Sequence, residues 1–141
     1  MDFVFLAGQL LSVRANLLQV PAFQHMSKMM KGELFVLNYL ATHEAVIHPK
    51  ELSEKLVVST ARIASLLNHM EEKGLIIRSA DLSDSRQIIV RLTPAGELAI
   101  QKIREEVILR LSSMLEDLGP EDAREYIRIH EKILRNFKNT D

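Results

Sequence analysis

The sequence predicts a mainly α-helical fold with one small β-hairpin, built as a single domain of 141 residues. Three observations support this prediction. Apolar residues recur every three or four positions over most of the chain, which is the helical period. Two short runs rich in β-branched residues, 75–78 and 87–92, flank a polar segment, as the strands of a hairpin do. Proline, glycine, serine or threonine stands where one predicted element gives way to the next.

Composition excludes several classes of protein. Apolar residues make up 47% of the chain and charged residues 26%, the balance of a folded rather than a disordered protein. The absence of cysteine excludes disulfides, thiolate zinc sites and thiol-based redox sensing. The sequence contains no glycine-rich phosphate loop, nucleophile elbow or zinc-hydrolase pattern, so we predict neither an enzyme nor a bound cofactor. No apolar run approaches the roughly 20 residues of a membrane span, and we expect no membrane partner.

The first predicted element is an amphipathic helix over residues 3–20, which Pro21 ends. Its apolar seam consists of Phe3, Leu6, Leu10, Val13, Leu17 and Val20. The apolar opening also resembles a secretory signal, but it lacks a basic leading region, and polar residues interrupt it at helical spacing. We therefore expect a cytoplasmic protein. The following stretch, residues 22–31, shows no clear period.

Two helices are predicted next. Residues 33–42 are apolar nearly all round, and we expect them at the centre of the core. Pro49 suits the first position of a short helix in which Leu52 and Leu56 lie one turn apart. The pair at 57–58 then forms a tight turn.

A further amphipathic helix is predicted for residues 60–73. Ser59 is a suitable N-cap for this helix, and Gly74 ends it. The buried face follows the spacing i, i+3, i+4, i+7 and consists of Ile63, Leu66, Leu67 and Met70. The opposite arc carries Ala61, Arg62, Ser65, Asn68, His69 and Glu72.

The remaining elements are the hairpin and two C-terminal helices. The two strand-like runs enclose a charged tip, residues 79–86. Thr93 and Pro94 then cap and open a long helix, whose apolar seam consists of Ile100, Ile103, Val107, Leu111, Met114 and Leu118. A Gly-Pro pair, residues 119–120, breaks this helix. The last helix carries the apolar residues Tyr126, Ile127, Ile133, Leu134 and Phe137.

The order of the central elements, two helices joined by a short turn and followed by a hairpin, is typical of a winged helix-turn-helix. Such a unit can place its second helix in the major groove of DNA while the hairpin reaches the flanking backbone or minor groove. Small polar residues and Arg62 on the outward arc suit close approach to base edges. Ser59 and Thr60 lie at the helix N-terminus, where backbone N–H groups can also bind a phosphate. The alternative is that this arc is only the solvated face of a surface helix.

Several motifs resemble one family. Residues 52–56 and 59–76, with their Glu-Glu-Lys-Gly stop, resemble the helix-turn-helix of the MarR family. The wing 81–86, an Asp-x-x-Asp-x-Arg tip, leads into Leu-Thr-x-x-Gly at 92–96, which resembles that family's wing and exit helix. The resemblance covers residues 33–100 closely and the flanking helices by arrangement.

The resemblance implies a homodimeric regulator that binds double-stranded palindromic DNA, with a recognition helix in each of two successive major grooves. Arg86 would reach the minor groove or its phosphates, and Asp84 would orient the wing. An ordinary charge at a hairpin tip is the alternative for Arg86. The predicted DNA-binding residues are Ser59, Thr60, Ala61, Arg62, Ser65, His69, Asp84 and Arg86. We expect a repressor, although nothing in the residues separates repression from activation.

The charge of the chain gives little support to the prediction of DNA binding. The formal net charge is −1. Residues 47–96 contain seven basic side chains, Lys50, Lys55, Arg62, Lys73, Arg78, Arg86 and Arg91. They also contain six acidic ones, Glu51, Glu54, Glu71, Glu72, Asp81 and Asp84. Family members often carry basic residues where this chain has Ser65 and His69, so a winged helix that binds proteins and has lost DNA binding remains the alternative function.

The terminal segments have no partner within the small lobe of residues 33–96. We expect residues 1–21 and 97–141 to form dimerisation helices, the alternative being that they fold back on their own monomer. The resemblance also implies a small, aromatic or anionic effector near the junction with the lobe, where Phe23, His25, Met26 and Met30 lie, although methionines also fill ordinary cores. His43, Glu44 and His48 straddle a turn, and we interpret them as solvated loop residues rather than a metal site.

Overall fold

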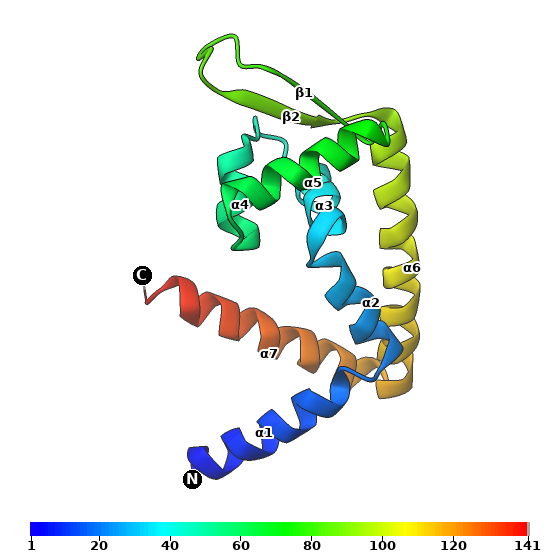
Figure 1. Ribbon diagram of the computed structural model, residues 1–141. Coiled ribbons are helices and arrows are strands. Elements are labelled where there is room, and N and C mark those ends of the chain that lie inside the picture. The colour runs from blue at the N-terminus through cyan, green and yellow to red at the C-terminus, as the bar shows by residue number, and fades with distance from the viewer. Residues whose placement is uncertain (141) are drawn as a thin grey trace.

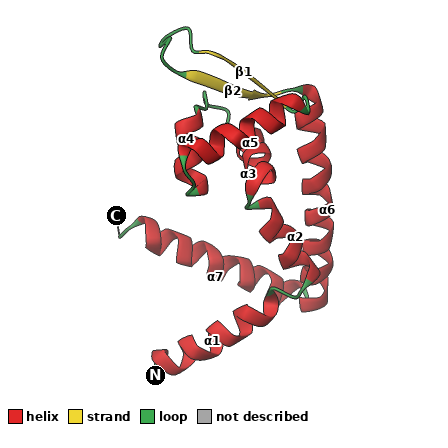
Figure 2. Ribbon diagram, viewed as in Figure 1, coloured by secondary structure: helices red, strands yellow, loops and turns green. Residues whose placement is uncertain are grey.

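The computed structural model describes residues 1–140, over which the chain forms seven helices and one two-stranded antiparallel sheet (Figures 1 and 2). The elements are α1 (Phe3–Leu17), α2 (Pro21–Met29), α3 (Gly32–Thr42), α4 (Pro49–Leu56), α5 (Thr60–Glu72), β1 (Ile76–Ala80), β2 (Ile88–Leu92), α6 (Pro94–Leu118) and α7 (Pro120–Lys138). The predicted mainly α fold with a hairpin is confirmed.

The lobe formed by α3, α4, α5 and the hairpin surrounds one hydrophobic core. The face of α5 predicted from its period is buried, and it packs with Leu52 of α4, Ile76 of β1 and Val90 of β2. Ile100 on the first turns of α6 closes this core. Burying each such side chain stabilises the fold by about 1.5–3 kcal/mol. The lobe is therefore held by its own contacts.

The turn between α4 and α5 sets the angle of the second helix. Val57 ends α4 in the left-handed region, with φ 56° and ψ 51°. The Ser59 hydroxyl accepts a hydrogen bond from the backbone N–H of Arg62 at 3.1 Å, which is the N-cap predicted for α5. Gly74 follows the end of α5 with φ +74°, the conformation that favours glycine after a helix.

The hairpin is anchored to the lobe along β2. Its strands pair from Ile76 opposite Leu92 to Ala80 opposite Ile88. The Val90 backbone N–H donates to the carbonyl of Ile47 at 2.9 Å, outside the sheet. β1 extends two residues beyond its predicted end because Ser79 and Ala80 continue the ladder, so the tip begins later than predicted, at 81.

The start of α6 is locked to the end of α5. The Thr93 hydroxyl donates to the Gly74 carbonyl at 2.6 Å and accepts from the Gly96 N–H at 3.0 Å. Gly96 packs so closely that a Cβ there would lie 2.1 Å from the Leu75 carbonyl oxygen. Only glycine fits this junction, which connects the lobe to the long helix.

The N-terminal segment differs from its prediction. α1 ends at Leu17 rather than Val20, and Pro21 begins α2 instead of only ending α1. The stretch without clear period, residues 22–31, is mostly helical, with Ala22 and Met29 buried. A short helix of this kind is held by packing against α3 and α6, which a periodicity search does not detect.

The terminal helices project from the far end of α6. In Figure 1, α1 and α7 lie at the lower end of α6, which is the end far from the hairpin, and both extend to the left. Within the described residues, neither α1 nor α7 contains a buried residue. No single helix of residues 1–140 is long and apolar enough to cross a membrane, although α1 and α2, bent by 86°, meet those limits as a pair.

Candidate nucleic-acid interface

The outward arc of α5 is open to solvent. All eight residues predicted to contact DNA are exposed: five lie at the N-terminal half of α5, His69 lies in its last turn, and two lie on the wing tip. Behind them, Ile63, Leu66, Leu67 and Met70 fix the rotation of the helix in the core. The arc is therefore presented by a rigid element.

The N-terminus of α5 retains donors for an anion. Ser59 uses its hydroxyl to cap the Arg62 N–H, and its carbonyl accepts from Ile63. The N–H groups of Thr60 and Ala61 have no hydrogen-bond partner within residues 1–140. Exposed N–H groups at a helix start bind phosphate well.

Two basic side chains of the lobe are committed to internal pairs. Arg78 on β1 donates to Glu71 at 2.7 Å and to Asn68 at 2.7 Å, which ties α5 to the hairpin. The hydrogen bonds from Arg78 lower the pKa of Glu71. Lys73 pairs with Glu33 of α3 at 2.9 Å. Arg78 and Lys73 are thus removed from the set that could neutralise phosphates.

The other basic side chains of residues 47–96 form no ion pair within residues 1–140; they are Lys50, Lys55, Arg62, Arg86 and Arg91. Lys50 at the start of α4 and Arg86 on the wing line one hollow of about 490 Å³, together with His48 and Glu54. Cations from α4, α5 and the wing therefore remain available on the lobe.

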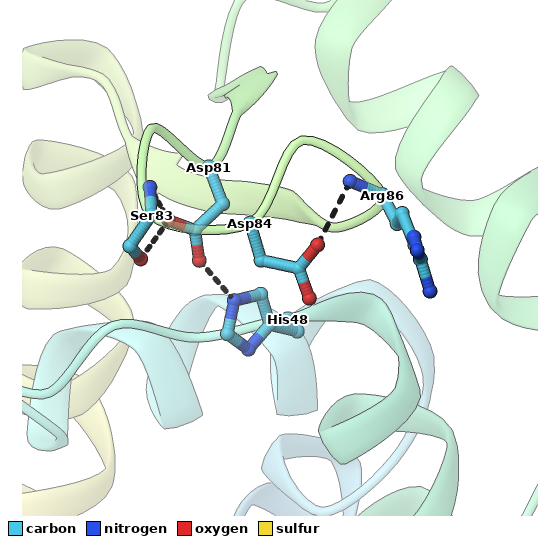
Figure 3. Close-up of polar contacts among 5 residues, drawn as sticks. All are labelled: His48, Asp81, Ser83, Asp84 and Arg86. Carbon is cyan, nitrogen blue, oxygen red and sulfur yellow. Dashed lines mark hydrogen bonds and ion pairs between the residues drawn. The ribbon is translucent and has the colours of Figure 1, made fainter.

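The wing tip is organised by two carboxylates (Figure 3). Asp84 accepts from the Arg86 backbone N–H at 3.1 Å, while the Arg86 side chain extends away from the other labelled side chains. Asp81 accepts from the Ser83 hydroxyl at 2.6 Å and lies 2.9 Å from Nε2 of His48. These bonds, from Ser83 first and then His48, lower the pKa of Asp81 to about 2.

The pairing of His48 with Asp81 was not predicted. His48 was interpreted as a solvated loop residue, which is wrong, because its side chain is only 29% exposed and is bonded to the wing. The two residues lie 33 positions apart, and neither belongs to a local pattern, so no signal in one sequence could join them. His43 instead stacks on Tyr39, with ring centroids 3.8 Å apart. Among residues 1–140, no three His, Asp or Glu side chains are grouped as a metal site.

The predicted effector residues are partly brought together. Phe23, Met26 and Met30 line a cavity of about 570 Å³ between α1, α2, α6 and α7, which Arg14 and His130 also line. His25 does not line it, and its Nδ1 lies 2.8 Å from the Pro21 carbonyl oxygen. The cavity is mostly apolar with basic groups at its wall, features that suit a small ligand with an apolar body and an anionic end.

Known proteins share this architecture. The crystal structure of YusO from Bacillus subtilis superposes with a TM-score of 0.71 at 22% identity, over 96% of this chain and 98% of that one. The complex of Staphylococcus aureus MepR with DNA gives a TM-score of 0.63 at 19% identity, over 92% and 96%. At these identities the likeness establishes the fold.

Sequence similarity relates the central part of the chain to one family. The MarR family model matches residues 30–87, which span the helix-turn-helix and the wing tip. The uncharacterized HTH-type transcriptional regulator YdgJ of Bacillus subtilis (strain 168) is 28% identical over 109 residues, or 77% of this chain. The chain spans 65% of the length of that relative. Residues 30–87 of this chain thus match the MarR family, and the curated relative that the chain resembles is named a helix-turn-helix transcriptional regulator.

Proposed function

We propose that this protein is a cytoplasmic homodimeric repressor that binds palindromic operators and is released by a small-molecule effector. The observation that carries the DNA-binding part is the exposed polar arc of α5, beside Arg62, Arg86 and Lys50, which form no ion pair within residues 1–140. MepR, which shares the fold, forms a complex with DNA, and this supports the proposal.

Each part of the arc has its own role. Ser59 and Thr60, at the N-terminus of α5, meet a phosphate through backbone N–H groups and hydroxyls. Ala61, Arg62, Ser65 and His69 lie along the groove, where small and polar side chains allow contact with base edges. On the wing, Asp84 holds the tip and Arg86 binds the backbone or minor groove, which positions the protein without reading sequence. Arg62 and Arg86 therefore contribute affinity in different ways.

The terminal helices form the dimer. α1 and α7 contain no fully buried residue in the monomer, and their exposed apolar residues include Leu10, Ile133 and Phe137. Covering them with the same helices of a second copy gives two-fold symmetry, and two-fold symmetry matches a palindromic site. The effector occupies the cavity lined by Phe23, Met26 and Met30 at the base of these helices, where it can change the spacing of the two lobes.

Fluorescence anisotropy tests the DNA-binding proposal. The protein is titrated onto DNA from upstream of its own gene and onto random DNA, at several salt concentrations. We expect specific binding with a steep salt slope. Arg86→Ala should weaken binding to all sequences alike and lower the slope by about one, because one phosphate contact is lost. Lys102→Ala, which removes an exposed charge from α6, is the matched control and should bind as the wild type does.

The same experiment separates the two functions. Absence of any preference at low salt, followed by selection from a random DNA pool that enriches no sequence, would contradict DNA binding. It would support the alternative function, a winged helix that binds proteins. The near balance of charge in residues 47–96 favours this alternative.

A further inference from the structure

A hydrogen-bonded chain joins the wing tip to the start of α4. His48 is the N-cap residue of α4, but its side chain makes no cap hydrogen bond. Its Nε2 instead lies 2.9 Å from Oδ2 of Asp81, the first residue after β1 (Figure 3). The imidazole therefore reaches from the helix-turn-helix to the wing.

Asp81 lies at the base of the wing tip. Its side chain is only 11% exposed. Oδ1 accepts from both the backbone N–H and the hydroxyl of Ser83, at 2.9 and 2.6 Å. The Asp81 backbone N–H donates to Gln87 at 3.0 Å, and its carbonyl accepts from Asp84 at 3.3 Å. Asp81 thus links the two ends of the wing tip by hydrogen bonds.

The direction of the bond from His48 follows from the chemistry of Asp81. Its hydrogen bonds keep the pKa of Asp81 at about 2, so the carboxylate is ionised at neutral pH. An ionised carboxylate only accepts hydrogen bonds. His48 must therefore donate from Nε2, and a hydrogen bond to a charged acceptor is stronger than one between neutral groups.

The neighbouring residue holds the other strand. Ile47 accepts from the Val90 N–H at 2.9 Å, so residues 47 and 48 anchor β2 by the backbone and the tip by a side chain. Beyond this anchor, every residue from 82 to 86 is exposed. Without the His48 bond, the tip would depend on the sheet ladder and its own turns.

We propose that His48 is a positioning residue for DNA binding: its bond to Asp81 holds the wing tip against α4 and so places Arg86. Lys50 and Arg86 line the same hollow as His48, so the clamp also sets the spacing of these two cations. This inference rests on the proposed function. His48 itself need not touch DNA.

The size of the effect is bounded. A bond to a charged acceptor shifts a local opening equilibrium by about tenfold or more. Affinity falls in proportion to the fraction of molecules with a competent tip, and it cannot fall further than when the Arg86 contact is lost entirely. We expect His48→Leu to weaken operator binding by about three- to tenfold and by less than Arg86→Ala.

Two substitutions at one position separate a hydrogen-bonding role from a packing role. His48→Leu removes the donor, whereas His48→Gln keeps a side-chain amide donor and should restore most of the affinity. Arg86→Ala should have a smaller effect in the His48→Leu protein than in the wild type, because the two residues act through one contact. Wild-type affinity in His48→Leu, or effects that simply multiply, would overturn the proposal.

Hydrogen exchange of the free protein provides a readout without DNA. We expect amides in 81–87 to exchange about tenfold faster in His48→Leu, with His48→Gln close to the wild type. His43→Leu is the matched control, since His43 stacks on Tyr39. Unchanged exchange of the tip in His48→Leu refutes the clamp whatever the DNA result. Faster exchange in a protein whose wild type binds no DNA would instead refute the proposed function and, with it, a positioning role in DNA binding.

Discussion

The second helix of the helix-turn-helix, α5, and the C-terminal helix α7 are both amphipathic, yet only α5 buries its apolar stripe within this chain. α5 buries Ile63, Leu66, Leu67 and Met70 within its own lobe, while α7 buries none of its residues. Ile133 and Phe137 of α7 are 62% and 68% exposed. An apolar stripe therefore shows that a helix needs a cover, but it does not show whether the cover is the same chain or another one.

The stability of the lobe and the stability of the terminal helices should depend differently on protein concentration. Isolated helices are marginally stable in water, and most of their stability comes from packing. The lobe supplies that packing internally, so its stability should not depend on protein concentration. α1 and α7 depend on a second copy in our proposal, and their stability should rise with concentration.

The largest effect is expected for a charge in the seam of α7. Ile133→Asp places a carboxylate on a face that the proposed dimer buries, and an unpaired buried charge is strongly unfavourable. We expect a monomer in light scattering and a loss of operator affinity of about 100-fold or more, because the two half-sites no longer bind together. Lys132→Asp, on the same helix, should remain dimeric. A dimeric Ile133→Asp protein would remove α7 from the interface.

Two glycine substitutions compare the regions directly. Gly96→Ala forces a Cβ against the Leu75 carbonyl, and we expect the free energy of unfolding to fall by about 1–3 kcal/mol or more in urea. Gly8 of α1 has no atom within 4 Å of such a Cβ. Gly8→Ala should be neutral or stabilise the helix by up to about 1 kcal/mol. A large loss at Gly8 instead would show that a partner helix approaches α1 there.

Local signals predicted the lobe well. The period of α5, its Ser59 cap and the Gly74 stop all lie within a few residues of one another, and each has a direct physical cause in the backbone. α2 escaped prediction because its nine residues are held by Pro21 at the first turn and by packing against other helices. Pro21 was interpreted only as an end, although proline is also favoured at a helix start.

The candidate site was harder to predict from the sequence than the lobe. The exposed arc of α5 can be predicted from the helical period, but the side-chain pairs that form around it cannot. His48 and Asp81 meet across 33 residues, and Lys73 meets Glu33 across 40. Such pairs depend on how the elements are packed, and a single sequence contains no local trace of them. His25 is a different case, because its Nδ1 makes a local contact with the Pro21 carbonyl oxygen one turn earlier.

A smaller effect is expected at the turn between α4 and α5. Val57 is β-branched and lies in the left-handed region, which costs about 1–2 kcal/mol for a non-glycine residue. Val57→Gly removes this strain but adds entropy to the unfolded chain, so we expect unfolding free energy to rise by roughly 0.5–1 kcal/mol. Val58→Gly is the control and should destabilise, since Val58 packs on the core. Destabilisation by Val57→Gly would mean that the added entropy of the unfolded chain outweighs the relief of strain at this turn.

The smallest expected effect is a change in stability at low pH. The pKa of Asp81 is lowered to about 2 from its ordinary 3.8, mainly by Ser83 and then by His48. Its carboxylate therefore contributes stability above about pH 4, and this contribution disappears as the pH falls toward 2. Asp81→Asn lacks it, so the gap in melting temperature between wild type and variant should close between pH 5 and pH 2. The change is small beside the titration of the other carboxylates among 19 acidic residues, and only the difference between the two proteins isolates it. A gap that stays constant over this range would mean that Asp81 supports the wing through its shape rather than through its charge.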